Sequence, residues 1–107
     1  MCGICGEVRF DGKRPQPERL ARMMDCMEAR GPDGDGILAR GPVALGHRRL
    51  KIIDLSDAAQ QPMTDTFLGL SIVYNGAIYN YPELREELQG LGYRFFSRGD
   101  TEVIIKA

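Results

Sequence analysis

The sequence predicts an α+β fold, in which helices pack on a sheet whose strands run mostly antiparallel. Short apolar runs bounded by Gly, Pro, Asn or Asp are typical of strands, and two of them flank a predicted hairpin turn at Gly41-Pro42. Two other segments repeat their apolar residues with the period of a helix. The predicted order is strand, helix, strands, helix, strand, helix, and the recognisable connections are hairpins. We therefore favour an antiparallel α+β arrangement over a doubly wound parallel sheet.

The N-terminal half is predicted to begin with a strand over residues 4–10, which ends at an Asp11-Gly12 turn. A helix is expected over residues 17–30, because four apolar side chains follow the spacing i, i+3, i+4, i+7: Leu20, Met23, Met24 and Met27. We assign this Met-rich stripe to core packing, and the Gly-rich stretch 31–36 ends the helix. The two hairpin strands are predicted over residues 37–40 and 43–50.

The C-terminal half is predicted to contain a polar loop, two strands and two helices. In chain order these are a loop over 54–66, a buried strand over 68–74, a helix over 80–91, a short strand over 93–96 and a last helix opening at Gly99-Asp100. Asn80 and Glu83 have the spacing of a capping box at the start of the first helix, whose apolar face is formed by Leu84, Leu88 and Leu91. The last helix has no stop signal, so we expect the N-terminal part of a longer protein.

The composition argues against several classes of partner. A chain of 107 residues forms one domain at most, and its net charge of −1 gives no reason to expect nucleic acid or an anionic membrane. No apolar run approaches the roughly 18 residues of a membrane span, and a secretory signal pattern is absent. The odd number of cysteines, 3, does not make a disulfide framework. These features predict a reduced, cytoplasmic protein.

Cys2 is the most informative residue, because it follows an initiator methionine that the cell can remove. Removal of Met1 would place a thiol and a free α-amine on one residue, as nucleophile and candidate base. An α-amine has a pKa of about 7.7–8.0, close to the pH at which proton transfer works best. Activation of a nucleophile by a terminal amine is a recognised catalytic arrangement. The sequence therefore predicts Cys2 as a candidate nucleophile.

Four further segments accompany the N-terminal motif Met1-Cys2-Gly3-Ile4-Cys5-Gly6. They are Arg30-Gly31-Pro32-Asp33, the run 47–54 (HRRLKIID), the run 74–80 (YNGAIYN) and the run 99–104 (GDTEVI). In this order they resemble the class II glutamine amidotransferases, specifically the glutaminase domain of the asparagine synthetase group, over essentially the whole chain. The stretch 43–87 also resembles the subgroup of N-acetylglutaminylglutamine amide synthases.

The resemblance implies the fold and chemistry of an N-terminal-nucleophile hydrolase, with two antiparallel sheets sandwiched between helices (αββα). Cys2 would attack the side-chain carboxamide of L-glutamine, its α-amine would carry the proton to the leaving ammonia, and a thioester would be hydrolysed to glutamate. The side-chain amide of Asn75 and the backbone N–H of Gly76 would stabilise the oxyanion. Preorganised donors of this kind contribute about 3–4 kcal/mol each.

The resemblance also assigns the residues that bind the amino-acid end of glutamine. Arg49 would clamp the α-carboxylate, while its neighbour Arg48 faces the opposite way on a strand, and Asp100 would receive the α-ammonium. The remaining residues assigned to the glutamine site are Leu50, Lys51, Ile52, Ile53, Asn75, Gly76 and Ala77. Ala77 is a departure, since many relatives have Glu there, and loss of such a charge-assisted bond would cost roughly 1.5–3 kcal/mol if nothing replaced it.

The partners that the resemblance implies lie largely outside this chain. Residues 2–107 would be the N-terminal part of a glutaminase domain that needs no metal or cofactor of its own. A C-terminal synthetase domain would use ATP and Mg²⁺ to activate an acceptor carboxylate, either of aspartate or of a glutamine dipeptide. The oligomeric state stays open between a monomer and a homodimer.

Simpler readings of these motifs remain open from the sequence. Cys2 and Cys5, with Cys26 and His47, could form a zinc site or, as a Cys-x-x-Cys pair, a redox site. Asn75-Gly76 could be only a hairpin turn, the basic run from His47 to Lys51 a solvated edge, and Asp100 only an N-cap. A non-catalytic interaction module is the remaining alternative, and retention of Met1 would be its signature.

Overall fold

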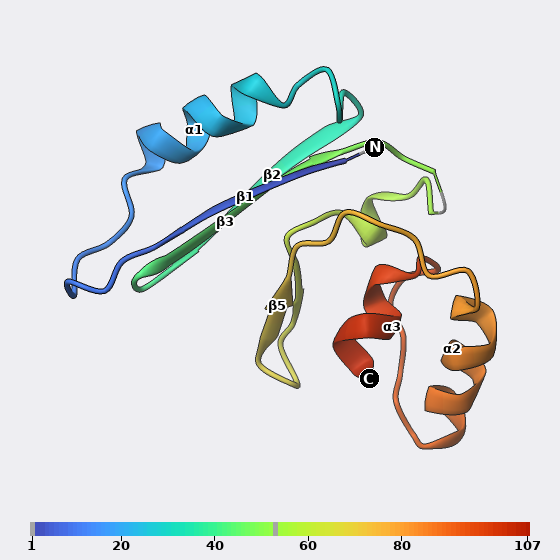
Figure 1. The fold of residues 1–107 in the computed structure, drawn as a ribbon. Coiled ribbons are helices and arrows are strands. Elements are labelled where there is room, and N and C mark those ends of the chain that lie inside the picture. The colour runs from blue at the N-terminus through green and yellow to red at the C-terminus, as the bar shows by residue number, and fades with distance from the viewer. Residues whose placement is uncertain (1, 53) are drawn as a thin grey trace.

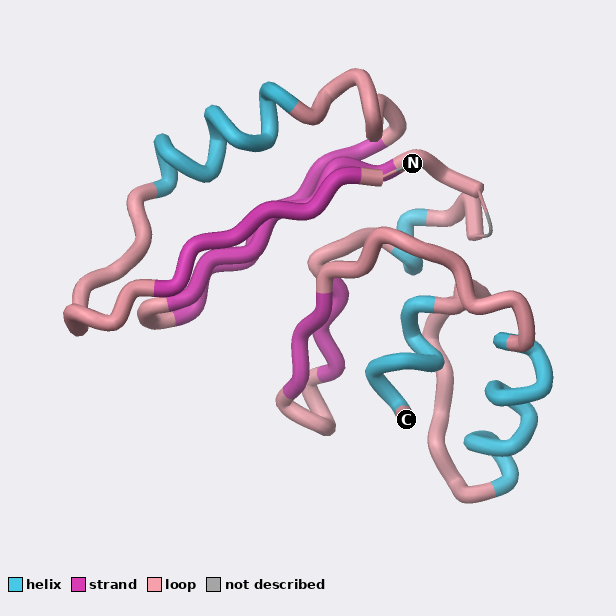
Figure 2. Tube along the Cα trace, viewed as in Figure 1, coloured by secondary structure: helices cyan, strands magenta, loops and turns pink. Residues whose placement is uncertain are grey.

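The structure is a computed structural model that describes residues 2–52 and 54–107. Its helices are α1 (Pro17–Cys26), α2 (Tyr81–Gly90) and α3 (Thr101–Lys106), with a single 3₁₀ turn, η1 (Asp57–Ala59). Its strands are β1 (Gly3–Val8), β2 (Gly34–Arg40), β3 (Val43–Arg49), β4 (Met63–Asp65) and β5 (Leu70–Ile72). Figure 2 shows how these elements alternate with long irregular segments.

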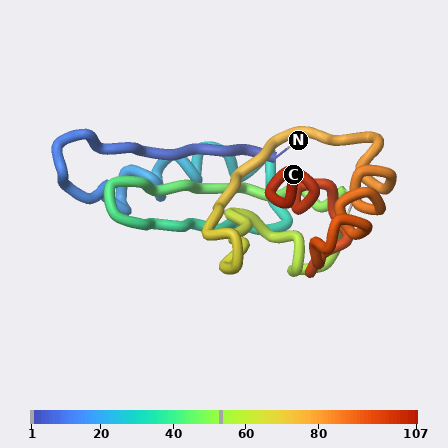
Figure 3. Tube along the Cα trace, turned by 90° about the horizontal axis from the view of Figure 1, so that it is seen from below, coloured from blue at the N-terminus to red at the C-terminus, as the bar shows by residue number. Residues whose placement is uncertain are grey.

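Three strands form an antiparallel sheet in the order β1-β3-β2. Gly3 lies opposite Arg48 in the first ladder, and Ile37 lies opposite Gly46 in the second. Figures 1 and 3 show the three strands side by side, with the start of β1 close to the other half of the molecule. The central position of β3 means that its last residues are held on both sides.

The two faces of β3 have different neighbours, as alternation along a strand requires. Gly46 faces α1, where the Met24 sulfur would lie 2.7 Å from a Cβ built on this glycine, and Arg48 on the same face donates to the Gly31 carbonyl. His47 and Arg49 point the other way, toward the second half of the chain. The prediction that Arg48 and Arg49 face opposite sides is confirmed.

A two-stranded antiparallel sheet, β4–β5, lies on the face of the first sheet that α1 does not cover (Figure 1). Helix α3 packs on β4 and β5, and α2 packs on α3. Met63, Val103 and Ile105 are buried in this half, as Leu20 and Met24 of α1 are in the other. The layers therefore run helix, sheet, sheet, helix, which is compatible with the sandwich of N-terminal-nucleophile hydrolases.

The α+β class and the antiparallel hairpins are confirmed, whereas several boundaries differ from the prediction. Helix α1 ends at Cys26, because residues 27–30 form turns that bring the chain back to β3. Strand β2 begins at Gly34 rather than residue 37, and β5 is limited to Leu70–Ile72. The predicted loop over 54–66 contains both η1 and β4.

Two local predictions are wrong. Residues 93–96 form no strand, because the backbone N–H groups of Phe96 and Ser97 donate to the Glu102 carboxylate instead of to a neighbouring strand. Asn80 makes no side-chain capping hydrogen bond, so the expected capping box does not form. Within the described residues, no helix has the length and apolarity needed to cross a membrane.

Candidate functional site

A cavity of about 500 Å³ opens where the end of β3 meets the segments 74–81 and 99–101. The volume is within the usual range of small-molecule sites. Predicted site residues that line it are Cys2, Arg49, Leu50, Ile52, Asn75, Gly76, Ala77 and Asp100. The fold therefore brings together residues that are up to 98 positions apart in the sequence.

Cys2 immediately precedes β1, whose antiparallel pairing with β3 brings Gly3 opposite Arg48 and the Cys2 thiol next to Leu50. The Leu50 N–H donates to the Cys2 sulfur at 3.3 Å, and the thiol lies 3.7 Å from the Leu50 carbonyl oxygen. Arg30 Nε donates to the Cys2 carbonyl at 3.3 Å. Cys2 is thus held at the cavity wall by the Leu50 backbone, which contacts its thiol, and by Arg30, which binds its carbonyl.

The segment Arg30-Gly31-Pro32-Asp33 supports the site from behind. The Asp33 N–H donates to the Arg49 carbonyl, and the Asp33 carboxylate accepts from the Lys51 N–H, both at 2.9 Å. A Cβ on Gly31 would lie 2.3 Å from the backbone carbonyl carbon of Arg48. Only a glycine lets this segment run so close to β3, so this motif fixes the direction of residues 49–51.

Arg49 is the last residue of β3, and it is 6% exposed. Its Nη1 donates to the Ser56 carbonyl at 2.7 Å, and its Nη2 donates to the Asp54 carbonyl. A guanidinium has five N–H donors in a fixed plane, so donors remain for a ligand in the cavity. This burial and these partners are not those of a solvated basic edge.

One predicted binding residue, Lys51, is not placed in the cavity, and the position of a second is not described. Lys51 is absent from the lining residues, and its ammonium lies 3.4 Å from the Asp57 carboxylate. Ile53 lies outside the residues that the structure describes.

Asn75 and Gly76 lie in an irregular segment that follows β5, and not in a hairpin turn, since the next element is α2 and Gly76 has no positive φ. A Cβ on Gly76 would meet the Tyr74 hydroxyl at 2.6 Å, so the phenol ring packs directly on this glycine. The Asn75 Oδ1 is buried and has no hydrogen-bond partner within the described residues. The side-chain oxygen of Asn75 therefore lacks a hydrogen-bond donor within the described residues of the free cavity.

Asp100 is 6% exposed and precedes α3 without making a side-chain capping bond. Its Oδ2 accepts from the Ile78 N–H at 2.8 Å, which ties the segment 74–80 to the start of α3. The pairing leaves Oδ1 for a ligand. Asp100 is thus not the simple N-cap that its place before a helix could indicate.

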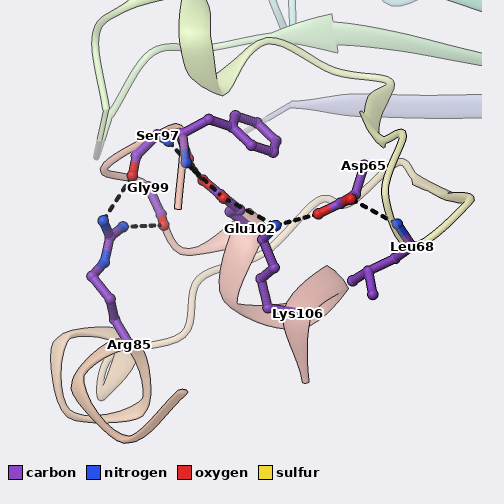
Figure 4. Close-up of polar contacts among 8 residues, drawn as sticks. Asp65, Leu68, Arg85, Ser97, Gly99, Glu102 and Lys106 are labelled. Carbon is purple, nitrogen blue, oxygen red and sulfur yellow. Dashed lines mark hydrogen bonds and ion pairs between the residues drawn. The ribbon is translucent and has the colours of Figure 1, made fainter. Parts of the chain in front are cut away.

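The loop before Asp100 is fixed by two side chains, Glu102 and Arg85, drawn in Figure 4. Glu102 is fully buried, and it accepts from the N–H groups of Phe96 and Ser97 and from the Ser97 hydroxyl. Arg85 of α2 donates to the carbonyls of Ser97 and Gly99, at 2.7 and 2.9 Å. These anchors hold Asp100 toward the cavity.

A buried ion pair joins α3 to the two-stranded sheet β4–β5. Lys106 donates to Asp65 of β4, and its Nζ lies 3.9 Å from the Glu102 carboxylate (Figure 4). The hydrogen bond from Lys106, with a second from the Leu68 N–H, lowers the pKa of Asp65 below its usual value. The β4–β5 hairpin and α3 are therefore linked by charge as well as by apolar packing.

Several lining residues were not predicted, among them Asp54, Gln61, Tyr74, Tyr81 and Thr101. Burial alone would raise the pKa of Asp54, but hydrogen bonds from Ser56 and Arg98 outweigh it, so this pKa is lowered. Asp54 and Tyr74 belong to motifs that the sequence singled out. Gln61 lies in the segment 54–66, predicted as a polar loop, and nothing in the local sequence pattern indicates that it lines a site.

The structure does not assemble the ligands of the zinc alternative. Cys5 lies on the α1 side of the sheet, 2.7 Å from a Cβ built on Gly46, while Cys2 lines the cavity and Cys26 is exposed. Over residues 2–52 and 54–107, no group of three or more His, Cys, Asp or Glu side chains could hold a metal ion.

His47 is fully buried, with Nε2 3.2 Å from the Tyr74 carbonyl oxygen. Burial lowers the pKa of His47; the hydrogen bond to Tyr74 opposes this shift, and the positive charge of Arg49 adds to it. The folded protein therefore favours the neutral ring. Because a neutral ring must donate to a carbonyl, Nε2 carries the proton.

Acidification is expected to destabilise the fold through His47. The unfolded chain binds a proton at its ordinary pKa of about 6.5, which the folded chain takes up only at lower pH. Stability from the neutral ring is complete above that pH and is lost as the pH falls toward the lowered pKa, by at most about 1.4 kcal/mol per pH unit. Thermal unfolding of the full-length gene product between pH 7.5 and 5 should show a steeper fall for wild type than for His47→Gln. Parallel profiles would contradict this assignment.

Comparison with protein families matches residues 1–107 to the glutamine amidotransferase domain. Glutamine-hydrolysing asparagine synthetase 3 of Bacillus subtilis (strain 168) is 39% identical over 108 residues, which cover 98% of this chain and 17% of the relative. Asparagine synthetase 1 of the same organism is 41% identical over 108 residues, covering 95% of this chain and 17% of the relative. The glutamine–fructose-6-phosphate aminotransferase of Sulfurisphaera tokodaii is 33% identical over 132 residues, covering 97% and 22%.

The chain thus spans about a sixth of the length of the two synthetases. The match covers every element described above, from β1 to α3. The chain is similar to part of the glutamine-hydrolysing asparagine synthetases, and it belongs to the glutamine amidotransferase family.

Proposed function

We propose that this domain hydrolyses L-glutamine at Cys2 and supplies the ammonia to an amidation reaction. The observation that carries the proposal is the cavity itself, which is lined by the Cys2 thiol, the Asn75 side-chain amide, the Arg49 guanidinium and the Asp100 carboxylate, from four separate segments. Each has a counterpart on glutamine. The unrelated acceptors in the names of the relatives indicate that the glutamine end is what these domains share.

The chemical step begins at the Cys2 sulfur. Once Met1 has been removed, the α-amine of Cys2 takes the thiol proton while the sulfur bonds to the carboxamide carbon. The oxyanion that forms accepts from the Asn75 amide and the Gly76 N–H. The C–N bond then breaks, the amine returns the proton to the leaving ammonia, and water hydrolyses the thioester to glutamate.

The two charged groups at the amino-acid end of the substrate are bound by side chains of opposite charge. Arg49 binds the α-carboxylate with the N–H donors that the carbonyls of Ser56 and Asp54 leave unused. Asp100 binds the α-ammonium with the oxygen not used by Ile78. The carboxamide N–H of glutamine can also donate to the unsatisfied Asn75 Oδ1, which favours an amide over a carboxylate ligand.

Ala77 lines the cavity without contributing a charge. In relatives with Glu at position 77, a second carboxylate could bind the α-ammonium. In this protein the α-ammonium is bound by Asp100. We therefore expect glutamine affinity to depend on Asp100 more heavily than in relatives with Glu at this position.

The rest of the reaction is assigned to the portion of the protein beyond this domain. We propose a synthetase domain that activates an acceptor carboxylate with ATP and Mg²⁺ in the cytoplasm. Aspartate and a glutamine dipeptide are the two acceptors that we propose, and the residues that choose between them are not in this chain.

A diazoketone analogue of glutamine tests the site directly. Peptide-mapped mass spectrometry of the full-length gene product should find the label on Cys2, with Met1 absent. L-glutamine should protect against labelling and D-glutamine should not, because only the L-enantiomer reaches Arg49 and Asp100 together. In Arg49→Lys, which cannot form the bidentate pair, protection should need roughly 10-fold more L-glutamine, the equivalent of about 1.4 kcal/mol.

The result that rejects the proposal is equally definite. Met1 retained and Cys2 unlabelled would mean an interaction module rather than a glutaminase. Label on the exposed Cys26 as readily as on Cys2 would mean that the analogue reports thiol exposure and not a glutamine site.

A further inference from the structure

Among the residues that the structure describes, the segment that carries Asn75 and Gly76 has no strand partner beside it. Strand β5 ends at Ile72, and the two backbone polar groups of Tyr74 are taken up by side chains instead. The Tyr74 carbonyl oxygen pairs with His47 Nε2 at 3.2 Å, and the Tyr74 N–H donates to Gln61 Oε1 at 2.5 Å. The position of the residue next to Asn75 is thus set by two side chains.

Gln61 is also bound at its other end. Its Nε2 donates to the Thr101 hydroxyl at 3.2 Å, and Thr101 directly follows Asp100. The orientation of the amide is fixed by chemistry, since the Tyr74 N–H can only donate and must face the oxygen. Gln61 is 7% exposed and borders the cavity, so water competes weakly for either bond.

We propose, on the basis of the function proposed above, that Gln61 is a positioning residue that sets the oxyanion donors relative to the substrate-binding carboxylate. One amide joins the residue before Asn75 to the residue after Asp100. The hydrogen bond between Ile78 and Asp100 also connects these two segments, but Ile78 follows the oxyanion donors in the chain. The Gln61 amide connects them on the other side of these donors, at Tyr74, and borders the cavity.

The proposal predicts an effect on the transition state more than on the ground state. Gln61→Met keeps the length of the side chain and removes both hydrogen bonds, so Tyr74 loses one of its two anchors. Displacement of the oxyanion donors lowers kcat, whereas Arg49 and Asp100 still bind the α-carboxylate and the α-ammonium of glutamine. We expect kcat for glutamine hydrolysis to fall about 10- to 100-fold, with KM changed by less than about 3-fold.

Inhibition by an aldehyde analogue of glutamine supplies the readout that a purely structural role would not produce. The Cys2 sulfur adds to its carbonyl carbon, and the thiol proton ends on the oxygen, which sits in the oxyanion hole. Its inhibition constant should rise in Gln61→Met in proportion to the loss of kcat/KM. Alkylation of Cys2 by iodoacetamide needs no oxyanion hole, and its rate should be unchanged.

Gln60→Met is the matched control, because the neighbouring glutamine is exposed and its side-chain amide donates to the Asp35 carbonyl, at 2.7 Å, away from the segments 74–80 and 99–101. Its kinetics should equal those of wild type. Unchanged kcat in Gln61→Met, or a loss of iodoacetamide reactivity that parallels the loss of kcat, overturns the inference. Absence of glutamine hydrolysis in wild type would instead reject the proposed function and, with it, the role of Gln61.

Discussion

Replacing Cys2 with alanine is expected to lower glutamine-dependent synthesis by at least about 10³-fold while ammonia-dependent synthesis survives. The substitution removes the nucleophile, and no other cysteine can replace it. Cys5 lies on the α1 side of the sheet, and Cys26 is exposed on α1, so neither borders the cavity. Ammonia supplied in solution needs no thiol, because it enters the amidation step directly.

The assay uses the full-length gene product with Mg-ATP and either aspartate or a glutamine dipeptide as acceptor. Amide formation is measured with L-glutamine and, separately, with ammonium chloride as nitrogen source. Cys26→Ala should behave as wild type with both sources. Equal loss of the two activities in Cys2→Ala would count against separate sites for hydrolysis and synthesis.

The largest effect on stability is expected from Gly31→Ala. The new Cβ would lie 2.3 Å from the carbonyl carbon of Arg48 and 2.6 Å from the backbone nitrogen of Arg49. Both are backbone atoms of the central strand, so no side chain can move aside to relieve the overlap. The loss should be about 3 kcal/mol or more, at the upper end for overpacking, and the unfolding midpoint should fall by on the order of 5–10 °C.

Gly34→Ala separates this clash from a general effect of alanine in the region. A Cβ there would meet its nearest neighbour, the Arg49 Cβ, at an ordinary 3.9 Å. Its midpoint should stay within about 2 °C of wild type, by thermal scanning of the full-length protein. If both variants melted alike, the close approach of residues 30–33 to β3 would be wrong.

The sequence predicted those parts of the molecule whose causes are local. Turn residues at Gly41-Pro42 marked the β2–β3 hairpin, and alternation along β3 separated Arg48 from Arg49. The convergence of Cys2, Arg49, Asn75 and Asp100 followed from family resemblance, and the cavity contains all four. No periodicity in the sequence would have indicated it.

The features that escaped prediction depend on side-chain contacts that no periodic pattern in the sequence records. The buried Glu102 carboxylate accepts from the Ser97 N–H and from the Phe96 N–H, which a strand at 93–96 would have used. Strand β4 is only 3 residues long, too short for alternation to reveal. Gln61 acts through residues 13 and 40 positions away, so its surroundings in the sequence carry no sign of its partners.

The way Arg49 is held has a consequence for how the domain can vary. Its two acceptors are main-chain carbonyls, at Asp54 and Ser56, and a carbonyl is present whatever side chain a position carries. Leu55 between them is 66% exposed. Substitutions at position 55 can therefore accumulate without redirecting the guanidinium, whereas Asp54 and Ser56 are constrained, because the Asp54 carboxylate accepts from the Arg98 N–H and from the Ser56 hydroxyl. Sequence variation at Leu55, whether natural or introduced in a library, should therefore leave the Arg49 guanidinium in place in the cavity.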